Sequence, residues 1–298
     1  MFYLCAIILC NGHITRTGGF MIRFGVSSSD HRPRQTTLLS LHALLLHTIH
    51  AGLRVCRIPA AYIAPLTEAS AEPLRSLVQQ YQLRLVVHAP IVAPYRLEEW
   101  FATVIGFYAQ LDASDSVIIC HLPRLTNADR AMFERLPAWV VRHLAIELTH
   151  QPATQLIASV TAYRVPVIFD TLHYDTQLPW PYQPIETMYL CMQSWHERTP
   201  LIHLSTQATT VGIRGTPPPR GQHSDVLAPM GAVWVIRSLV DTGQPADIEI
   251  EADSGMLAYR QLHETITRHV PDIAQPYSLR RQHEPTTNHT PGTLEATA

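Results

Sequence analysis

The sequence contains no lysine, and all 22 of its basic residues are arginine. Schiff-base catalysis, a P-loop phosphate site and a metal ligand made from a carboxylated lysine are therefore excluded, because each needs the lysine amine. Charged residues make up only 15% of the chain and the formal net charge is −2. No overall positive field indicates a nucleic-acid partner, although one local basic groove would be enough to bind one.

Cysteine is also scarce, with five residues and no C-x-x-C spacing. Cys56, Cys120 and Cys191 lie in apolar runs, which is typical of reduced, buried thiols in a cytoplasmic protein. The apolar residues 1–10 lack a basic flank and a cleavage site, and they are too short to span a bilayer. We interpret residues 1–20 as an N-terminal extension upstream of a translation start at Met21, with a signal anchor as the alternative, and we expect no membrane association.

From Met21 onward, short β-branched apolar stretches alternate with helical patterns. Strands are expected at 21–26, 53–58, 83–88, 116–121, 142–147, 165–170, 201–204 and 246–251. Helices are expected at 34–51, 66–81, 97–111, 127–136, 152–162, 232–240 and 255–268. Eight strands in about 250 residues predict a single-domain α/β protein, a (β/α)₈ TIM barrel, over residues 21–272. The polar residues 273–298 are expected to be a disordered tail.

Imidazole and carboxylate side chains lie at or just beyond the C-terminal ends of six consecutive predicted strands, where barrels build their active sites. They are His88, His121, Glu147, Asp170, His173, His203, His223 and Glu251. Any one of them could be an ordinary core histidine or a helix cap. Together, and without a thiolate, they suit Mn²⁺, Zn²⁺ or Fe²⁺, and eight ligands suggest two or three ions. Asp247 and Glu249 precede the strand end and are interpreted as flanking residues.

Several of these motifs together resemble those of UV damage endonucleases, which belong to the AP-endonuclease and xylose-isomerase-like barrel group. The resemblance lies in residues 21–25, 54–58, 120–122, 146–147, 169–173, 202–205, 222–225 and 247–252. It implies a barrel that binds up to three ions, usually manganese, and incises damaged double-stranded DNA on the 5′ side of photoproducts and abasic sites. Glu147, Asp170 and Glu251 would be catalytic through the ions they hold.

The resemblance also implies a division of the ligands between ions. His88, His121 and Glu147 would hold the first, and Glu147, Asp170, His223 and Glu251 the second. His173 and His203 would contribute to the third, where the family also uses a modified lysine that is Leu201 here. The glutamine and two tyrosines with which the family probes the lesion are replaced by Ile91, Val92 and Val26. The motifs therefore imply that the metal centre is kept while lesion recognition has changed.

Two other functions remain open from the sequence. One is a metal-dependent sugar isomerase or epimerase on the same barrel, and the other is a metal-binding homologue without catalysis. Loop arginines would favour the endonuclease, because arginine contacts phosphate through two hydrogen bonds. The candidates are Arg57, Arg96, Arg124, Arg214 and Arg220. We expect a monomer that uses Mn²⁺, with Zn²⁺ as the alternative.

Overall fold

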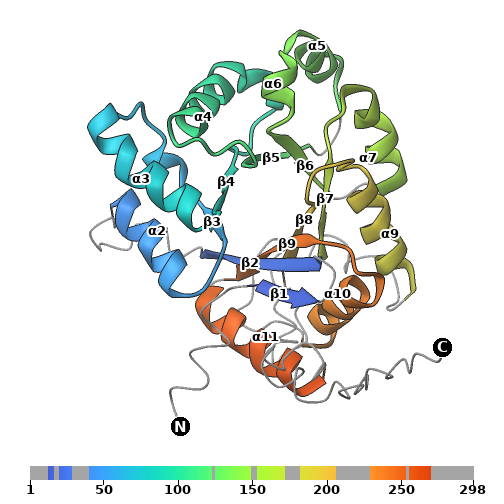
Figure 1. Ribbon diagram of the computed structural model, residues 1–298. Helices are drawn as coiled ribbons and strands as arrows, with labels where there is room; N and C mark the ends of the chain where they lie inside the picture. Colours follow the sequence, from blue (N-terminus) through green and yellow to red (C-terminus); the bar gives the residue numbers. More distant parts are fainter. Residues whose placement is uncertain are drawn as a thin grey trace, which may run out of the picture.

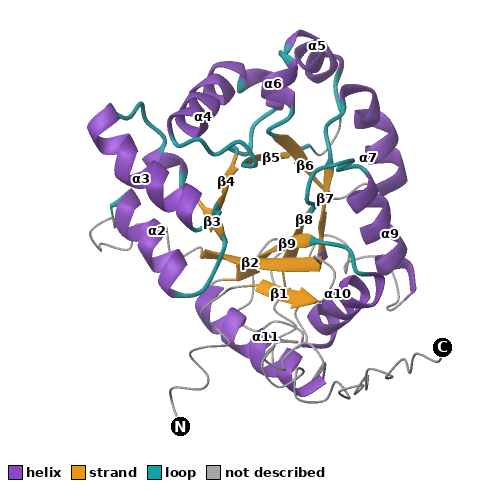
Figure 2. Cartoon of the chain, viewed as in Figure 1, coloured by secondary structure: helices purple, strands orange, loops and turns teal. Residues whose placement is uncertain are grey.

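Eight parallel strands form a closed barrel at the centre of the molecule, with helices around it (Figures 1 and 2). The structure is a computed structural model. It describes residues 13–16, 20–28, 40–122, 125–148, 153–171, 182–205, 229–252 and 255–269. The barrel strands are β2 (Phe20–Ser28), β3 (Val55–Arg57), β4 (Arg84–His88), β5 (Val117–His121), β6 (Leu144–Glu147), β7 (Val167–Asp170), β8 (Leu201–Ser205) and β9 (Ala246–Ala252). Each pairs with the next along the chain, and β9 pairs with β2. The predicted (β/α)₈ fold is confirmed.

The helices follow the strands as the sequence pattern predicts, with two additions. The expected helices are α2 (Leu41–His50), α3 (Glu68–Gln80), α4 (Glu98–Gln110), α5 (Asn127–Arg135), α7 (Ala153–Val160), α10 (Pro229–Thr242) and α11 (Gly255–His269). Local sequence explains their starts: Thr126, for example, forms a capping box with Asp129 at the beginning of α5. The sequence did not predict α6 (Ala138–Val141) or α9 (Tyr182–Gln193).

Side chains alternate along each strand, so the barrel has an outer and an inner set of residues. The outer set packs against the helices as the main hydrophobic core. A second apolar cluster, which we call the inner layer, consists of Val55, Val86, Val117, Ile119, Ala145, Ile168, Leu201 and Trp195. On β4 to β8, the position two residues after an inner-layer residue is a histidine, aspartate or glutamate. The inner layer therefore fills the barrel and places polar side chains above it, at the strand ends.

Near the start of the strands, the barrel interior holds a buried ionic cluster. Arg23 Nε and Arg84 Nη1 each lie 2.6 Å from a carboxylate oxygen of Asp247, and Asp115 adds a longer contact to each arginine. The side chains of Arg84 and Asp247 are fully buried. A buried charge is tolerated when it is paired in this way, so the cluster ties β2, β4 and β9 together at this end.

The structure differs from the sequence prediction at the N-terminus. Strand β1 (His13–Arg16) lies inside the predicted extension and pairs antiparallel with β2, which itself begins at Phe20 rather than at Met21. The prediction of buried, reduced cysteines agrees with the structure. Cys56, Cys120 and Cys191 are buried free thiols, and burial raises the pKa of each to about 12. No helix in the described part of the chain is long and apolar enough to cross a membrane.

We still expect a chain that begins at Met21 to fold. Deleting residues 1–20 removes β1, but β2 keeps its parallel partners β3 and β9 on both sides. The deleted strand contributes only one edge pairing outside the barrel. Soluble yield and the thermal unfolding midpoint of the shortened chain would test this, with the full chain as reference. Insoluble expression would show instead that β1 is needed to complete the fold.

Candidate metal centre

Three imidazoles and four carboxylates meet above the inner layer. They are His88 of β4, His121 of β5, Glu147 of β6, Asp170 of β7, His203 of β8, and Glu249 and Glu251 of β9. The register of the parallel strands explains their proximity. His121 is aligned with Glu147, and His203 is aligned with both Asp170 and Glu249. The strands thus deliver ligand-type atoms to one place without help from the loops.

One group of these residues contains His88, His121 and Glu147. His121 Nε2 lies 3.4 Å from His88 Nδ1 and 3.4 Å from Glu147 Oε2. The two imidazoles are partly exposed, while the glutamate is buried. One atom from each residue lies within 4.8 Å of the others, a spacing that one cation could close. This is the set that the resemblance implies for the first ion.

A second group surrounds His203. Its Nδ1 lies 3.5 Å from Glu147 Oε2, 3.7 Å from Glu251 Oε1 and 4.0 Å from Asp170 Oδ2, and all four side chains are buried. Glu147 therefore belongs to both groups. His203 therefore lies with Glu147, Asp170 and Glu251, whereas the resemblance implies that it contributes to a third ion with His173, which lies outside the described residues.

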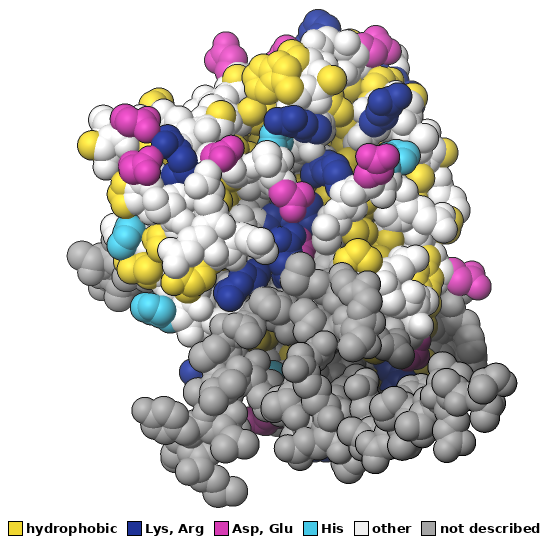
Figure 3. Space-filling model, viewed as in Figure 1, with side chains coloured by type: hydrophobic (Ala, Val, Ile, Leu, Met, Phe, Trp, Pro, Cys, Tyr) yellow, Lys and Arg dark blue, Asp and Glu magenta, His cyan; other side chains and the backbone are white. Residues whose placement is uncertain are grey.

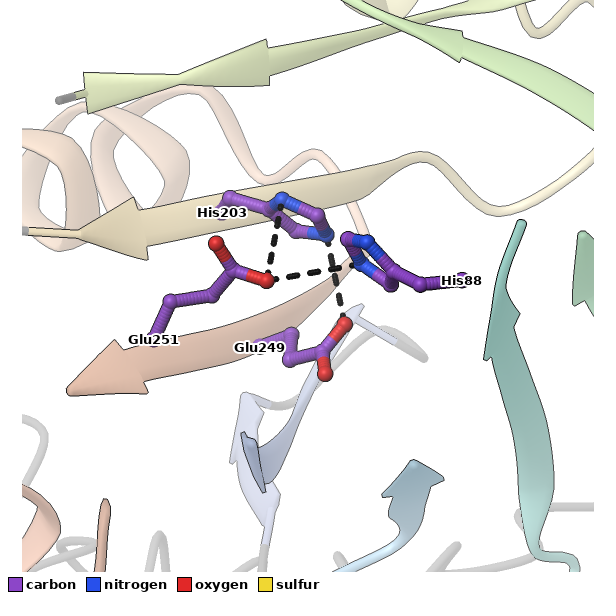
Figure 4. A group of neighbouring side chains, drawn as sticks. All are labelled: His88, His203, Glu249 and Glu251. Atoms are coloured by element: carbon purple, nitrogen blue, oxygen red, sulfur yellow. Dashed lines mark ion pairs between the residues drawn. The ribbon is translucent and has the colours of Figure 1, made fainter. Parts of the chain in front are cut away.

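Glu249 lies beside His203 and Glu251 in the barrel (Figure 4), and Arg57 contacts both glutamates. Glu249 Oε2 lies 3.2 Å from His203 Nε2, the ring nitrogen opposite the one that faces the second group. Arg57 Nη1 donates a hydrogen bond of 2.7 Å to Glu251, and its Nε lies 3.6 Å from Glu249. His88, His203, Glu249 and Glu251 also have cation-like spacing. The single guanidinium offsets only one of these two carboxylate charges. Because Glu249 Oε2 faces the ring nitrogen of His203 that points away from the second group, Glu249 is placed to orient His203.

The electrostatics of the centre favour a divalent cation. Burial, followed by the charge of Arg57, lowers the pKa of His88 well below its usual value, so its ring is neutral at pH 7 and keeps a lone pair for an ion. Burial opposes protonation of His203 as well, but Glu251, Glu249 and Glu147 outweigh it and raise its pKa to about 10. His203 is therefore protonated at neutral pH when no ion is bound, and the binding of a metal ion should release this proton.

The unsatisfied polar atoms and the net charge of these side chains also fit a bound metal ion. His88 Nε2, both ring nitrogens of His203 and both carboxylate oxygens of Glu249 are buried without a well-aligned hydrogen bond among the described residues. The centre contains four buried carboxylates but only one arginine, which contacts Glu249 and Glu251, and this leaves an excess of negative charge. Buried charge of one sign is costly, and bound cations are the usual compensation. Imidazole with carboxylate suits Mn²⁺, Zn²⁺ or Fe²⁺.

The structure brings together six of the eight sequence-predicted ligands. His173 and His223 lie outside the described residues, as do Arg124, Arg214 and Arg220. Arg96 is exposed after β4, where its Nε lies 3.2 Å from the Tyr95 hydroxyl. Arg57 differs from expectation, because it is engaged by the glutamates of the centre. Glu249 was wrongly interpreted as a flanking residue; its inward position follows from alternation, two residues before Glu251.

Comparison with known proteins identifies the fold. No protein-family model and no curated protein matches the sequence. Solved structures do match: the UV damage endonuclease SacUVDE has 17% identity and a TM-score of 0.61, covering 83% of this chain and 98% of that one. A D-tagatose 3-epimerase-like protein has 14% identity and a TM-score of 0.55, and the match covers 84% of this chain and 98% of that one. The probable 3-DHS dehydratase AsbF from Bacillus anthracis has 11% identity and a TM-score of 0.56, and the match covers 83% of this chain and 98% of that one. These similarities show a shared barrel fold, and enzymes with this fold catalyse several different reactions.

Proposed function

We propose that the protein is a metal-dependent endonuclease that hydrolyses a phosphodiester bond on the 5′ side of a lesion or abasic site in double-stranded DNA. The observation that carries the proposal is the buried cluster of imidazoles and carboxylates in which Glu147 is shared by two groups. Phosphodiesterases often use two neighbouring ions held in this way. The motif resemblance adds the DNA substrate. We further propose that the protein acts as a cytoplasmic monomer with manganese.

In this proposal the side chains of the centre have separate roles. His88, His121 and Glu147 would hold one ion, and Glu147, Asp170, His203 and Glu251 would hold another. Bound ions would neutralise charge on the phosphate and activate the attacking water. Arg57 holds Glu251 in place and offsets part of the negative charge, so that the carboxylates can stay ionised at close range. The pKa of Glu251 is lowered to about 2 because His203, Arg57 and His88 outweigh the opposing effect of burial.

The exposed residues that follow His88 support the proposal of a large substrate. Ile91 is 85% exposed and Val92 is 44% exposed, in the segment that follows His88. Tyr95 and Arg96 come next and are also exposed. An exposed apolar surface with an arginine beside the ligands is suited to contact with a nucleic acid. A sugar substrate would be better matched by a closed pocket. Val26 packs against the outer core and is not placed to contact a substrate.

We expect incision of abasic duplex to exceed incision of photoproduct-bearing duplex by about tenfold or more. Ile91 and Val92 offer no polar group to read a distorted base, and an abasic site already lacks the stacking that a photoproduct retains, worth up to a few kcal/mol. Gel assays of matched abasic, irradiated and intact duplexes across a Mn²⁺ titration would measure the ratio. The Glu147→Gln protein, purified in parallel, controls for contaminating nucleases. Efficient incision of photoproducts at low Mn²⁺ would contradict this expectation.

The second candidate is a sugar isomerase or epimerase, which the shared fold with the D-tagatose 3-epimerase-like protein equally allows. Proton transfer next to a carbonyl would use the same carboxylates and one ion. Incubation with ketohexoses and Mn²⁺, followed by chromatography of the products, separates the two functions. Epimerised sugar without DNA incision would replace the endonuclease proposal.

A further inference from the structure

A large groove lies at the opposite end of the barrel from the candidate metal centre. Its volume is about 1060 Å³, and three short stretches of chain line it: residues 133–142, 162–166 and 194–198. These stretches immediately precede β6, β7 and β8, so the groove opens where the strands begin. We call it the basal groove. Figure 3 views this end of the barrel and shows dark blue side chains, all arginine in a chain without lysine, gathered around the middle of the face.

The basal groove carries arginines that lack carboxylate partners. Arg142, Arg164 and Arg198 line it, and among the described residues no carboxylate forms an ion pair with any of them. Arg23 and Arg84, by contrast, are neutralised by Asp247 and Asp115 in the ionic cluster nearby. The groove arginines therefore carry positive charge that no ion pair among the described residues offsets.

Arg198 is the central member of this set. Its guanidinium lies 4.9 Å from the centre of the Trp195 ring, over which Arg84 also lies at 5.2 Å. Its Nη2 is buried and has no hydrogen-bond partner among the described residues. Burial, together with the charges of Arg84 and Arg142, outweighs the opposing charge of Asp115 and lowers the pKa of Arg198 to about 10. Water could satisfy the hydrogen bond, whereas a bound anion would also reduce the repulsion between the arginines.

The walls of the groove add an apolar component. The rings of Phe133 and Tyr163 lie 5.4 Å apart on one side, and Leu136 and Pro166 are close in sequence to them. Glu134 and Glu197 also line the groove and are exposed, as are Arg142 and Arg164, so three arginines exceed two glutamates by one charge. The lining thus combines cations with an aromatic surface, which is the combination that accepts a phosphate attached to a flat apolar group.

We propose that the basal groove binds a small organic phosphate with an aromatic or apolar body, and that Arg198 and Arg142 contact the phosphate. The site is separate from the metal centre, and its test does not depend on the proposed endonuclease function. Phenyl phosphate is a suitable probe, with inorganic phosphate and phenol as its two halves. Using metal-free protein, prepared with a chelator, removes any binding of phosphate to ions in the centre.

Calorimetric titration should show saturable binding of phenyl phosphate at one site, with inorganic phosphate weaker and phenol weaker still. Arg198→Gln should lower the affinity about tenfold or more, since it removes a charged hydrogen bond. Arg260→Gln, at an exposed position on α11, makes the same charge change outside the groove and should have no effect. If Arg198→Gln fails to fold, Arg142→Gln at an exposed position serves instead. Absent binding, or equal losses in the groove and control variants, would overturn the proposal.

Discussion

Replacing Glu147 with glutamine is expected to remove more than one divalent ion per chain. Glu147 Oε2 lies 3.4 Å from His121 Nε2 and 3.5 Å from His203 Nδ1, so this one oxygen faces both ligand groups. The side chain is buried, and the neutral amide of glutamine cannot replace the missing charge. No other residue of the centre is shared by the first group and the second in this way. The remaining ligands of each group would then have to bind an ion with one carboxylate fewer.

Elemental analysis of protein equilibrated with Mn²⁺ would measure the effect. Glu99→Gln is a matched control, because Glu99 is an exposed glutamate on α4, remote in sequence from the ligands. Circular dichroism would show whether the barrel persists. An ion count that stays unchanged in the Glu147→Gln protein would mean that Glu147 does not bridge the two groups.

Changes at Glu249 are expected to weaken metal binding although Glu249 would not itself hold an ion. Its Oε2 lies 3.2 Å from His203 Nε2, so it can accept a hydrogen bond from the N–H at that position and leave Nδ1 free to face the second group. Carboxylates that orient a metal-binding histidine in this way typically raise the affinity for the metal by about 10–100-fold. We expect Glu249→Gln to lose about tenfold, because the amide oxygen still accepts the hydrogen bond, and Glu249→Leu to lose about a hundredfold.

Two measurements would separate orientation from a general loss of structure. Metal titrations would rank the original protein, Glu249→Gln and Glu249→Leu, with the exposed Glu264→Gln as control. Nitrogen NMR of the histidine rings in the metal-loaded protein would report which nitrogen of His203 carries the proton. The glutamine variant should keep the proton on Nε2, and the leucine variant should show a mixture. Equal metal affinity in all four proteins would assign Glu249 a purely structural role.

The sequence was sufficient for the barrel and for most of the candidate centre, for a physical reason. A barrel strand is buried on both faces, so a histidine or acid at its end stands out against β-branched residues, as at His121 and Asp170. Glu249 lies two residues before Glu251, so a pattern of polar strand ends does not indicate it. Strand alternation alone would have placed it inward with Glu251 and Asp247.

Other features depend on contacts that local patterns do not contain. The start of α9 is obscured by Pro184, which usually signals a loop but is tolerated in a first helical turn. The basal groove combines three stretches of chain that meet only after the barrel closes. Assigning His203 to the second ligand group also required its ring orientation, because Nδ1 and Nε2 face different carboxylates.

The three inward acids of β9 give this strand a mechanical role. Asp247 is fixed to Arg23 and Arg84 where the strands begin, Glu249 and Glu251 are fixed to Arg57, and both glutamates contact His203. A rigid strand held at several points cannot slide along its axis without breaking all of these contacts together. Distances at the metal centre are therefore set partly by arginines at the far end of the barrel, and a disturbance there would be transmitted to the ligands as a displacement of the whole strand.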